Sequence, residues 1–186
     1  ITPDGRYYLA GLFGEDGIAK LDLWQLEKGS SKILENYGRG EEKLPVFKMP
    51  HLRGWSLAAG RVWLPAVGRH EVLVADARTW KEVSRVQVKG QPVFAMASPD
   101  GRQVWVNFAH PDNGWVQVID TLTGQVIKTL QPGKAILHME FTTRGEARDD
   151  NRVVIVDTRS FEQIGGFEVN APSGIFFTAR SARIGF

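Results

Sequence analysis

The sequence predicts an all-β fold made of about four repeated antiparallel sheets. Segments 2–24 and 98–121 each begin with a Pro-Asp-Gly turn signal, followed by an alternating strand, a second turn and another strand. Two further copies, at 59–88 and 143–169, lack the Pro-Asp-Gly signal. Because four short strands per roughly 40 to 50 residues are typical of a β-propeller blade, we predict a partial β-propeller.

A recurring aspartate marks a turn near the end of each copy. Asp22, Asp76, Asp120 and Asp157 each end a strand with apolar residues in their copy. Asp side chains accept hydrogen bonds from nearby backbone N–H groups, which stabilises tight turns. We therefore expect each of these residues to sit in the turn that joins two neighbouring antiparallel strands.

The repeats divide the chain into four predicted blades, at 1–50, 51–91, 92–133 and 134–186. Propellers have typically 4 to 8 blades and the first copy opens inside a blade, so we interpret the chain as roughly half of a larger propeller. Segment 27–43 is polar and punctuated by glycine, and we expect it to be an insertion between strands.

The fourth copy is shorter than the third. Asp100 and Asp120 are 20 residues apart, whereas the corresponding Arg144 and Asp157 are only 13 apart. We therefore expect about one strand to be missing near 146–149, which would leave a hydrogen-bonding ladder without its partner.

Composition limits the chemistry of the chain. Its 186 residues are 42% hydrophobic and 24% charged, with a net charge of +2. The lysines and arginines are spread along the sequence, so no nucleic-acid partner is expected. The absence of cysteine excludes disulfides, thiol catalysis and cysteine-bound metal clusters within this sequence. No apolar run approaches the roughly 20 residues of a transmembrane helix.

Three candidate site residues occupy equivalent positions in the repeats. His51, Met96 and His138 each lie in the stretch that leads into the turn of their copy, which predicts the strand nearest to the propeller axis. Segment 137–141 alternates apolar and polar residues, so the imidazole of His138 lies either on solvated surface or in a shared site. His110 ends the next strand of the third copy. A polar residue without a functional role remains the alternative for each histidine.

Two arginines are candidates for binding carboxylates. Arg53 and Arg69 lie in predicted turns beside glycine, and a guanidinium group can bind a carboxylate through two parallel hydrogen bonds. The alternative is that both are solvated turn charges. His70, next to Arg69, is interpreted as a surface residue. The six tryptophans are interpreted as packing between blades.

Six stretches in order resemble a known family, the NirF-type heme d1 biosynthesis proteins of denitrifying bacteria. They resemble more distantly the heme d1 domain of cytochrome cd1 nitrite reductase. The resemblance covers essentially the whole chain and implies the C-terminal half of an eight-bladed propeller. The stretches lie at 9–24, 44–55, 65–80, 90–113, 137–141 and 172–180.

The resemblance implies a function as well as a fold. It implies a periplasmic protein, sometimes lipid-anchored, that binds a late precursor of heme d1, of the dihydro-heme d1 type, in its central pocket. The implied partners are this tetrapyrrole, the other maturation proteins and nitrite reductase itself. Whether the protein is a carrier or an enzyme stays open, because both need the same pocket.

The resemblance also implies roles for individual residues. His51 resembles a reductase histidine on the distal side of the heme iron, and Met96 or Ser98 stands at the place of another. His138 lies in a stretch typical of the NirF type. The implied tetrapyrrole contacts are thus His51, Arg53, Arg69, Met96, His110 and His138, with His51 and His138 as ligand or acid–base groups. The proximal iron ligand is not assigned in this chain.

Two other functions remain open. One is a heme d1 redox enzyme, either a nitrite reductase domain or a dehydrogenase acting on the precursor, which predicts two distal histidines and an electron-transfer partner. The other is a propeller scaffold without cofactor, which predicts histidines that point into solvent.

Overall fold

The structure is a computed structural model of the chain, and it describes residues 1–37 and 54–169 apart from short gaps. The gaps lie at 3, 13–14, 67, 137, 142–145 and 150–151. His51 and Arg53 therefore lie outside the described residues. Within the described part, no helix is long and apolar enough to cross a membrane.

The described strands form four antiparallel sheets, each in sequence order. The first contains β1 (Tyr7–Gly11), β2 (Ile18–Asp22) and β3 (Ser30–Ile33). The second contains β4 (Ser56–Ala58), β5 (Arg61–Ala66), β6 (Glu71–Asp76) and β7 (Glu82–Gln87). The third contains β8 (Pro92–Ala97), β9 (Gln103–Phe108), β10 (Val116–Asp120) and β11 (Val126–Leu130). The fourth contains β12 (Met139–Glu140), β13 (Glu146–Asp149), β14 (Arg152–Val156) and β15 (Gln163–Glu168).

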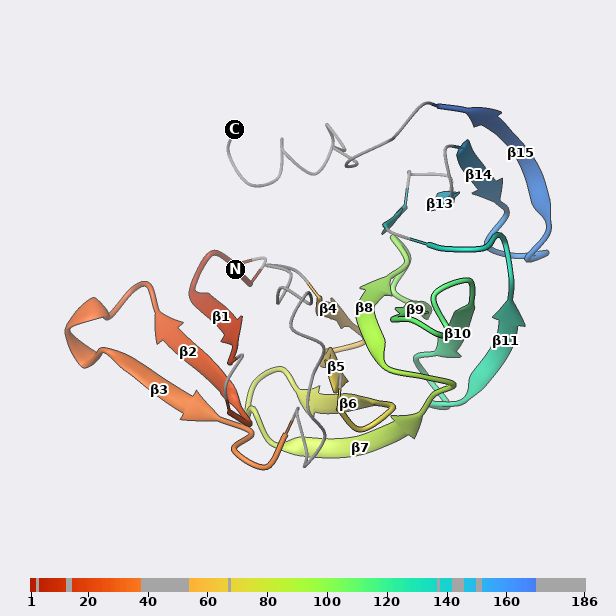
Figure 1. Cartoon of the computed structure of the whole chain (residues 1–186). Coiled ribbons are helices and arrows are strands. Elements are labelled where there is room, and N and C mark those ends of the chain that lie inside the picture. Colours follow the sequence, from red (N-terminus) through yellow and green to blue (C-terminus); the bar gives the residue numbers. More distant parts are fainter. Residues whose placement is uncertain are drawn as a thin grey trace.

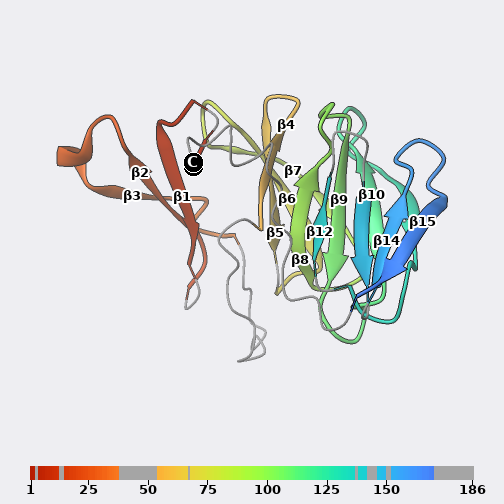
Figure 2. The same ribbon diagram turned by 90° about the horizontal axis from the view of Figure 1, so that it is seen from above.

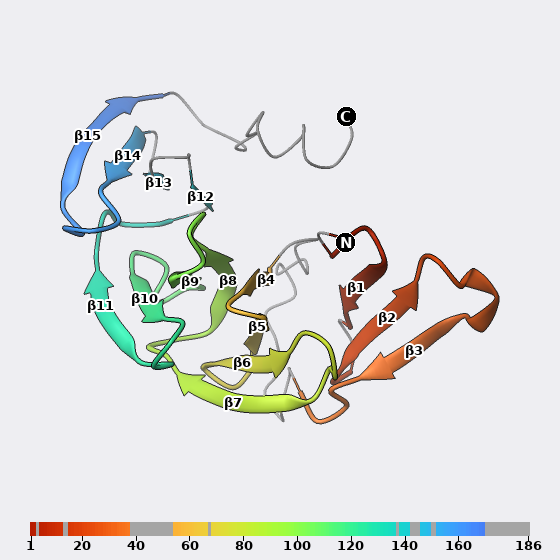
Figure 3. The same cartoon turned by 180° about the vertical axis from the view of Figure 1, so that it is seen from behind.

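The sheets follow one another around an open arc, with β4 and β8 towards its centre and β7, β11 and β15 on its outside (Figure 1). The view from behind shows β12 on the inner side of the fourth sheet (Figure 3). This radial arrangement of small antiparallel sheets is that of propeller blades. The prediction of a partial β-propeller is confirmed, and each sheet lies within one of the four predicted ranges.

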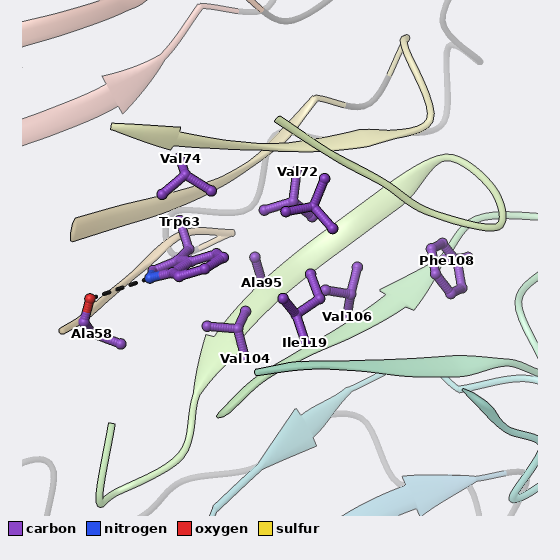
Figure 4. Packing of buried hydrophobic residues seen from close by; sticks show 10 residues of the cluster. Ala58, Trp63, Val72, Val74, Ala95, Val104, Val106, Phe108 and Ile119 are labelled. Atoms are coloured by element: carbon purple, nitrogen blue, oxygen red, sulfur yellow. Dashed lines mark hydrogen bonds between the residues drawn. The ribbon is translucent and has the colours of Figure 1, made fainter. Parts of the chain in front are cut away.

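Side chains from neighbouring sheets meet in three apolar cores. Trp63, Val72, Val74 and Ala95 belong to the core between the second and third sheets (Figure 4). The indole of Trp63 has no exposed surface, and its N–H donates to the carbonyl oxygen of Ala58 at 3.2 Å. Burial of large apolar side chains contributes roughly 1.5 to 3 kcal/mol each, so these cores hold the sheets together.

The four predicted aspartate turns are confirmed. In the third sheet, Asp120 Oδ1 accepts hydrogen bonds from the backbone N–H groups of Leu122 and Thr123 at 3.1 and 2.7 Å. Asp76 and Asp157 accept the equivalent pairs of bonds, and Asp22 accepts one. Donated hydrogen bonds favour the charged carboxylate and lower the pKa of all four groups.

Two expectations differ from the structure. A short strand, β13, lies at the position expected to be empty and pairs with β12 and β14, so the fourth sheet is four-stranded. β13 has four residues where β9 has six, which explains why its position looks empty in the sequence. The predicted insertion at 27–43 contains β3, a mostly exposed strand that pairs with β2. A polar outer strand carries no alternating apolar signal, so β3 cannot be recognised from its own residues.

Candidate functional site

The topology brings candidate residues to one face of the propeller. In each four-stranded sheet the innermost strand begins at this face, where the chain enters the sheet, and the second strand ends at it. We call it the connection face, and we call the opposite face, with the aspartate turns, the turn face; Figure 2 shows the strands side on between them. The described segments of the connection face include 15–17, 34–37, 68–70, 88–91, 109–115 and 131–136.

His138 lies at the inner edge of the connection face. It is half-buried and immediately precedes β12, the innermost strand of the fourth sheet. Its ring lies 5.9 Å from the ring of Phe94 on β8, with the planes tilted by 53°. The alternation that the sequence predicted is present, because Met139 and Phe141 are buried whereas His138 and Glu140 are partly exposed.

Met96 lies deeper in the molecule than His138. It is buried near the turn-face end of β8 and packs with Trp105, Met139 and Phe141 in the core between the third and fourth sheets. This position makes Met96 part of the inter-sheet packing. Its expected contact with a tetrapyrrole stays a prediction.

Arg69 and His110 are exposed residues of the connection face. Arg69 lies between β5 and β6, and its Nη2 atom lies 3.8 Å from Asp16 Oδ2, which links the second sheet to the first. His110 lies between β9 and β10 at the end of the third sheet. The structure therefore brings these residues and His138 to one face of the molecule, on three different sheets.

The connection face contains a buried residue that the sequence analysis did not select. Asn107, near the end of β9, is only 1% exposed and makes two side-chain hydrogen bonds. Its Oδ1 atom accepts from Phe94 N at 3.1 Å, and its Nδ2 atom donates to Ile136 O at 3.2 Å. The signal in the sequence was a single polar residue inside the apolar run 104–108.

A second group of contacts holds the connections of this face together. The backbone N–H of Lys89 donates to Gln117 Oε1 at 2.9 Å. Lys89 Nζ lies 3.5 Å from Asp112 Oδ1 and 4.8 Å from the centre of the Trp115 ring. The segment entering the third sheet is thereby bound to the loop that carries His110.

The histidines define the chemistry available at this face. A neutral imidazole can ligate iron or transfer a proton near neutral pH. Among the described residues, no group of three or more His, Cys, Asp or Glu side chains is placed to hold a metal ion. The predicted meeting of His51 with His138 falls outside the described residues and stays a prediction.

Comparison with known proteins decides the family. The family described as "Cytochrome D1 heme domain" matches residues 1–181. The chain belongs to this family. The NirF proteins of Pseudomonas aeruginosa and Stutzerimonas stutzeri are 55% and 53% identical to this chain over its whole length. The chain spans 48% and 49% of these relatives, and the matches confirm the resemblance to the NirF type.

Two solved structures share the fold of this chain. The dihydro-heme d1 dehydrogenase NirN in complex with DHE matches with a TM-score of 0.68 and 24% identity, covering 94% of this chain and 38% of that one. The hydrazine synthase of Kuenenia stuttgartiensis matches with a TM-score of 0.68 and 14% identity, covering 94% of this chain and 49% of that one. At these identities the likeness shows the fold alone.

Proposed function

We propose that the protein binds a late tetrapyrrole precursor during heme d1 biosynthesis, and that this chain supplies one part of the pocket. The match of residues 1–181 to the cytochrome D1 heme domain family carries this proposal. The two NirF relatives support a role in maturation. The NirN complex with DHE, which shares the fold, supports a ligand of the dihydro-heme d1 type.

The described residues fit such a ligand at one edge. An iron tetrapyrrole requires an axial donor and apolar walls beside its macrocycle, and when bound it supplies the iron chemistry. The half-buried imidazole of His138 offers a donor, and the buried ring of Phe94 beside it offers apolar surface. Arg69 on the same face carries a positive charge suited to a carboxylate substituent, although Asp16 already lies 3.8 Å from it.

Within this proposal, His51 and His138 act as iron ligand or acid–base groups. His110 lies farther from the iron and has neither role. The same pocket serves a carrier and an enzyme, so the proposal covers both. We further propose that the protein acts in the periplasm, together with other maturation proteins and nitrite reductase. The family resemblance of the sequence supports these two points.

A spectroscopic titration tests the proposal. The complete protein is titrated with heme d1 and with its dihydro precursor, and the Soret band is followed. We expect a shifted band, which His51→Ala abolishes and His138→Ala weakens by about tenfold in affinity. His70→Asn is the matched control, because His70 is an exposed histidine of the same face with a φ of 49°, which Asn tolerates.

The outcomes separate the three functions. A band that does not shift with either tetrapyrrole contradicts the proposal and favours a scaffold without cofactor. Turnover of nitrite by the loaded protein with an electron donor favours the redox enzyme. An equal effect of His70→Asn and His138→Ala removes His138 from the pocket.

A further inference from the structure

We infer that Asn107 is a positioning residue that holds His138 at the connection face through Phe94 and Ile136. The expected effect on ligand binding rests on the proposed tetrapyrrole site, whereas the contacts that hold His138 do not depend on it. Asn107 itself is 1% exposed and does not need to touch the ligand. It acts on two chain segments: one contains Phe94, and the other contains Ile136, two residues before His138.

The first observation is that Asn107 is a buried polar residue at a position where the four sheets share no residue type. The equivalent residue in each sheet pairs with the residue four positions before the turn aspartate. These equivalents are Gly11 in β1, Pro65 in β5 and Arg148 in β13, and none of them offers a carboxamide. A buried polar side chain in an otherwise apolar strand costs free energy unless it is fully hydrogen-bonded, so its presence calls for a reason.

The second observation is a β-bulge at the same place. Along the β8–β9 ladder, Pro92 pairs with Phe108 and Phe94 pairs with Asn107, so the register skips Val93. A bulge re-aims the side chains beside it, and here the Asn107 carboxamide accepts the Phe94 N–H at 3.1 Å. The bulge and the asparagine thus form one unit that sets the direction of the Phe94 side chain.

The third observation connects this unit to His138. The other end of the carboxamide donates to Ile136 O at 3.2 Å, two residues before His138. The backbone N–H of Ile136 donates to Asn113 O at 2.6 Å, which holds the same residue from its other side. The Phe94 ring then lies 5.9 Å from the imidazole. The orientation of the amide is unambiguous, since an N–H can only donate and a carbonyl can only accept.

These contacts link the position of the imidazole to the carboxamide of Asn107. Loss of the carboxamide leaves the Phe94 N–H and the Ile136 carbonyl without this partner in a buried region, and both segments must shift to regain hydrogen bonds. Because His138 lies two residues after Ile136 and its ring packs beside that of Phe94, we expect its ring to move with them.

The test uses Asn107→Asp in the complete protein with ring-labelled histidine. Aspartate keeps the shape and the acceptor for Phe94 N–H but cannot donate to Ile136 O when ionised. We expect the NMR resonance of His138 to shift and broaden without any tetrapyrrole, while those of His70 and His110 stay. In the tetrapyrrole titration we expect about tenfold weaker binding, comparable to the loss of one buried hydrogen bond.

Two further variants keep the inference testable. Asn113→Asp introduces the same charge next to the same segment, because Asn113 also bonds to Ile136. It does so through its backbone carbonyl, which the substitution keeps, so the His138 resonance should not change. Phe94→Leu leaves the carboxamide bonds in place and removes the aromatic ring, so it should shift the His138 resonance even where Asn107→Asp fails to fold.

The results distinguish this inference from the proposed function. An unchanged His138 resonance in folded Asn107→Asp, or in Phe94→Leu, overturns the positioning role. A shifted resonance in a protein whose wild type binds no tetrapyrrole upholds the positioning role and rejects the proposed function. Equal shifts for His70, His110 and His138 indicate a general structural defect and also overturn the inference.

Discussion

The turn face and the connection face of the propeller are built on different principles. On the turn face, one solution recurs in every sheet: an aspartate at the end of a strand accepts the next backbone N–H groups. On the connection face, the contacts change from sheet to sheet, with an ion pair at Arg69, a buried amide at Asn107 and a lysine over the Trp115 ring.

The difference teaches where function is to be sought. A local turn that satisfies its own backbone can be copied without regard to its neighbours, so repetition indicates a structural task. Contacts that join separate segments must be specified individually. The face on which they gather is also the face that carries the candidate histidines, as expected when binding residues lie on loops held by a rigid scaffold.

The largest effect is expected from Gly114→Ala on the connection face. A Cβ atom at Gly114 would lie 2.7 Å from Gly133 O and 3.0 Å from Lys134 O, both backbone atoms. We expect the free energy of unfolding to fall by about 2 to 3 kcal/mol, because the segment leading to the fourth sheet must move. Urea unfolding of the complete protein measures this loss.

Gly124→Ala on the turn face is the matched control. Gly124 has a φ of +71°, and no atom lies within 4 Å of the position that a Cβ would take there, so only backbone strain opposes the substitution. We expect a loss of about 1 kcal/mol. A loss as large as that of Gly114→Ala would show that the two faces do not differ in the way described.

A smaller effect is expected from Asp120→Asn, and it depends on pH. Hydrogen bonds from the Thr123 N–H, the Thr123 hydroxyl and the Leu122 N–H lower the pKa of the Asp120 carboxyl in the folded protein. The stabilisation is therefore present above the unfolded pKa of about 3.9 and is lost as the pH falls through the lower folded pKa.

We expect wild type to exceed Asp120→Asn by about 1 kcal/mol or less at neutral pH, with the two curves converging below about pH 4. Unfolding midpoints measured across the acid range test this. A difference that grows as the pH falls would contradict the assignment of Asp120 as a turn-stabilising carboxylate.

The smallest effect is expected from Lys89→Met on the connection face. The substitution removes an ion pair at 3.5 Å to Asp112 and the cation over the Trp115 ring, but keeps an apolar side chain of similar length. Exposed pairs of this kind contribute about 0.5 kcal/mol. We expect a loss of this size at low ionic strength that shrinks in high salt, measured by thermal or urea unfolding.

Much of the fold could be predicted from the sequence because its signals are local. The apolar run of β9 and the aspartates at 22, 76, 120 and 157 can be recognised from adjacent residues. β3 and β13 were missed because their pairing depends on backbone groups presented by β2 and β14, not on their own apolar pattern.

The candidate site was less accessible to sequence reasoning. His138 could be selected because its repeat position places it at the start of an innermost strand. Asn107 could not, since its role depends on a one-residue shift of the β8–β9 register and on a carbonyl 29 residues away. Met96 illustrates the opposite difficulty: the repeat position was right, yet its side chain packs between sheets.

Successive residues of one strand belong to different cores. On β8, Phe94 and Met96 pack towards the fourth sheet, while Ala95 packs towards the second. The sheets are consequently coupled as nearest neighbours along a line, so ordering β8 adds order to the interfaces on both sides of the third sheet. A small molecule that touches only this blade would in this way also stiffen the second and fourth.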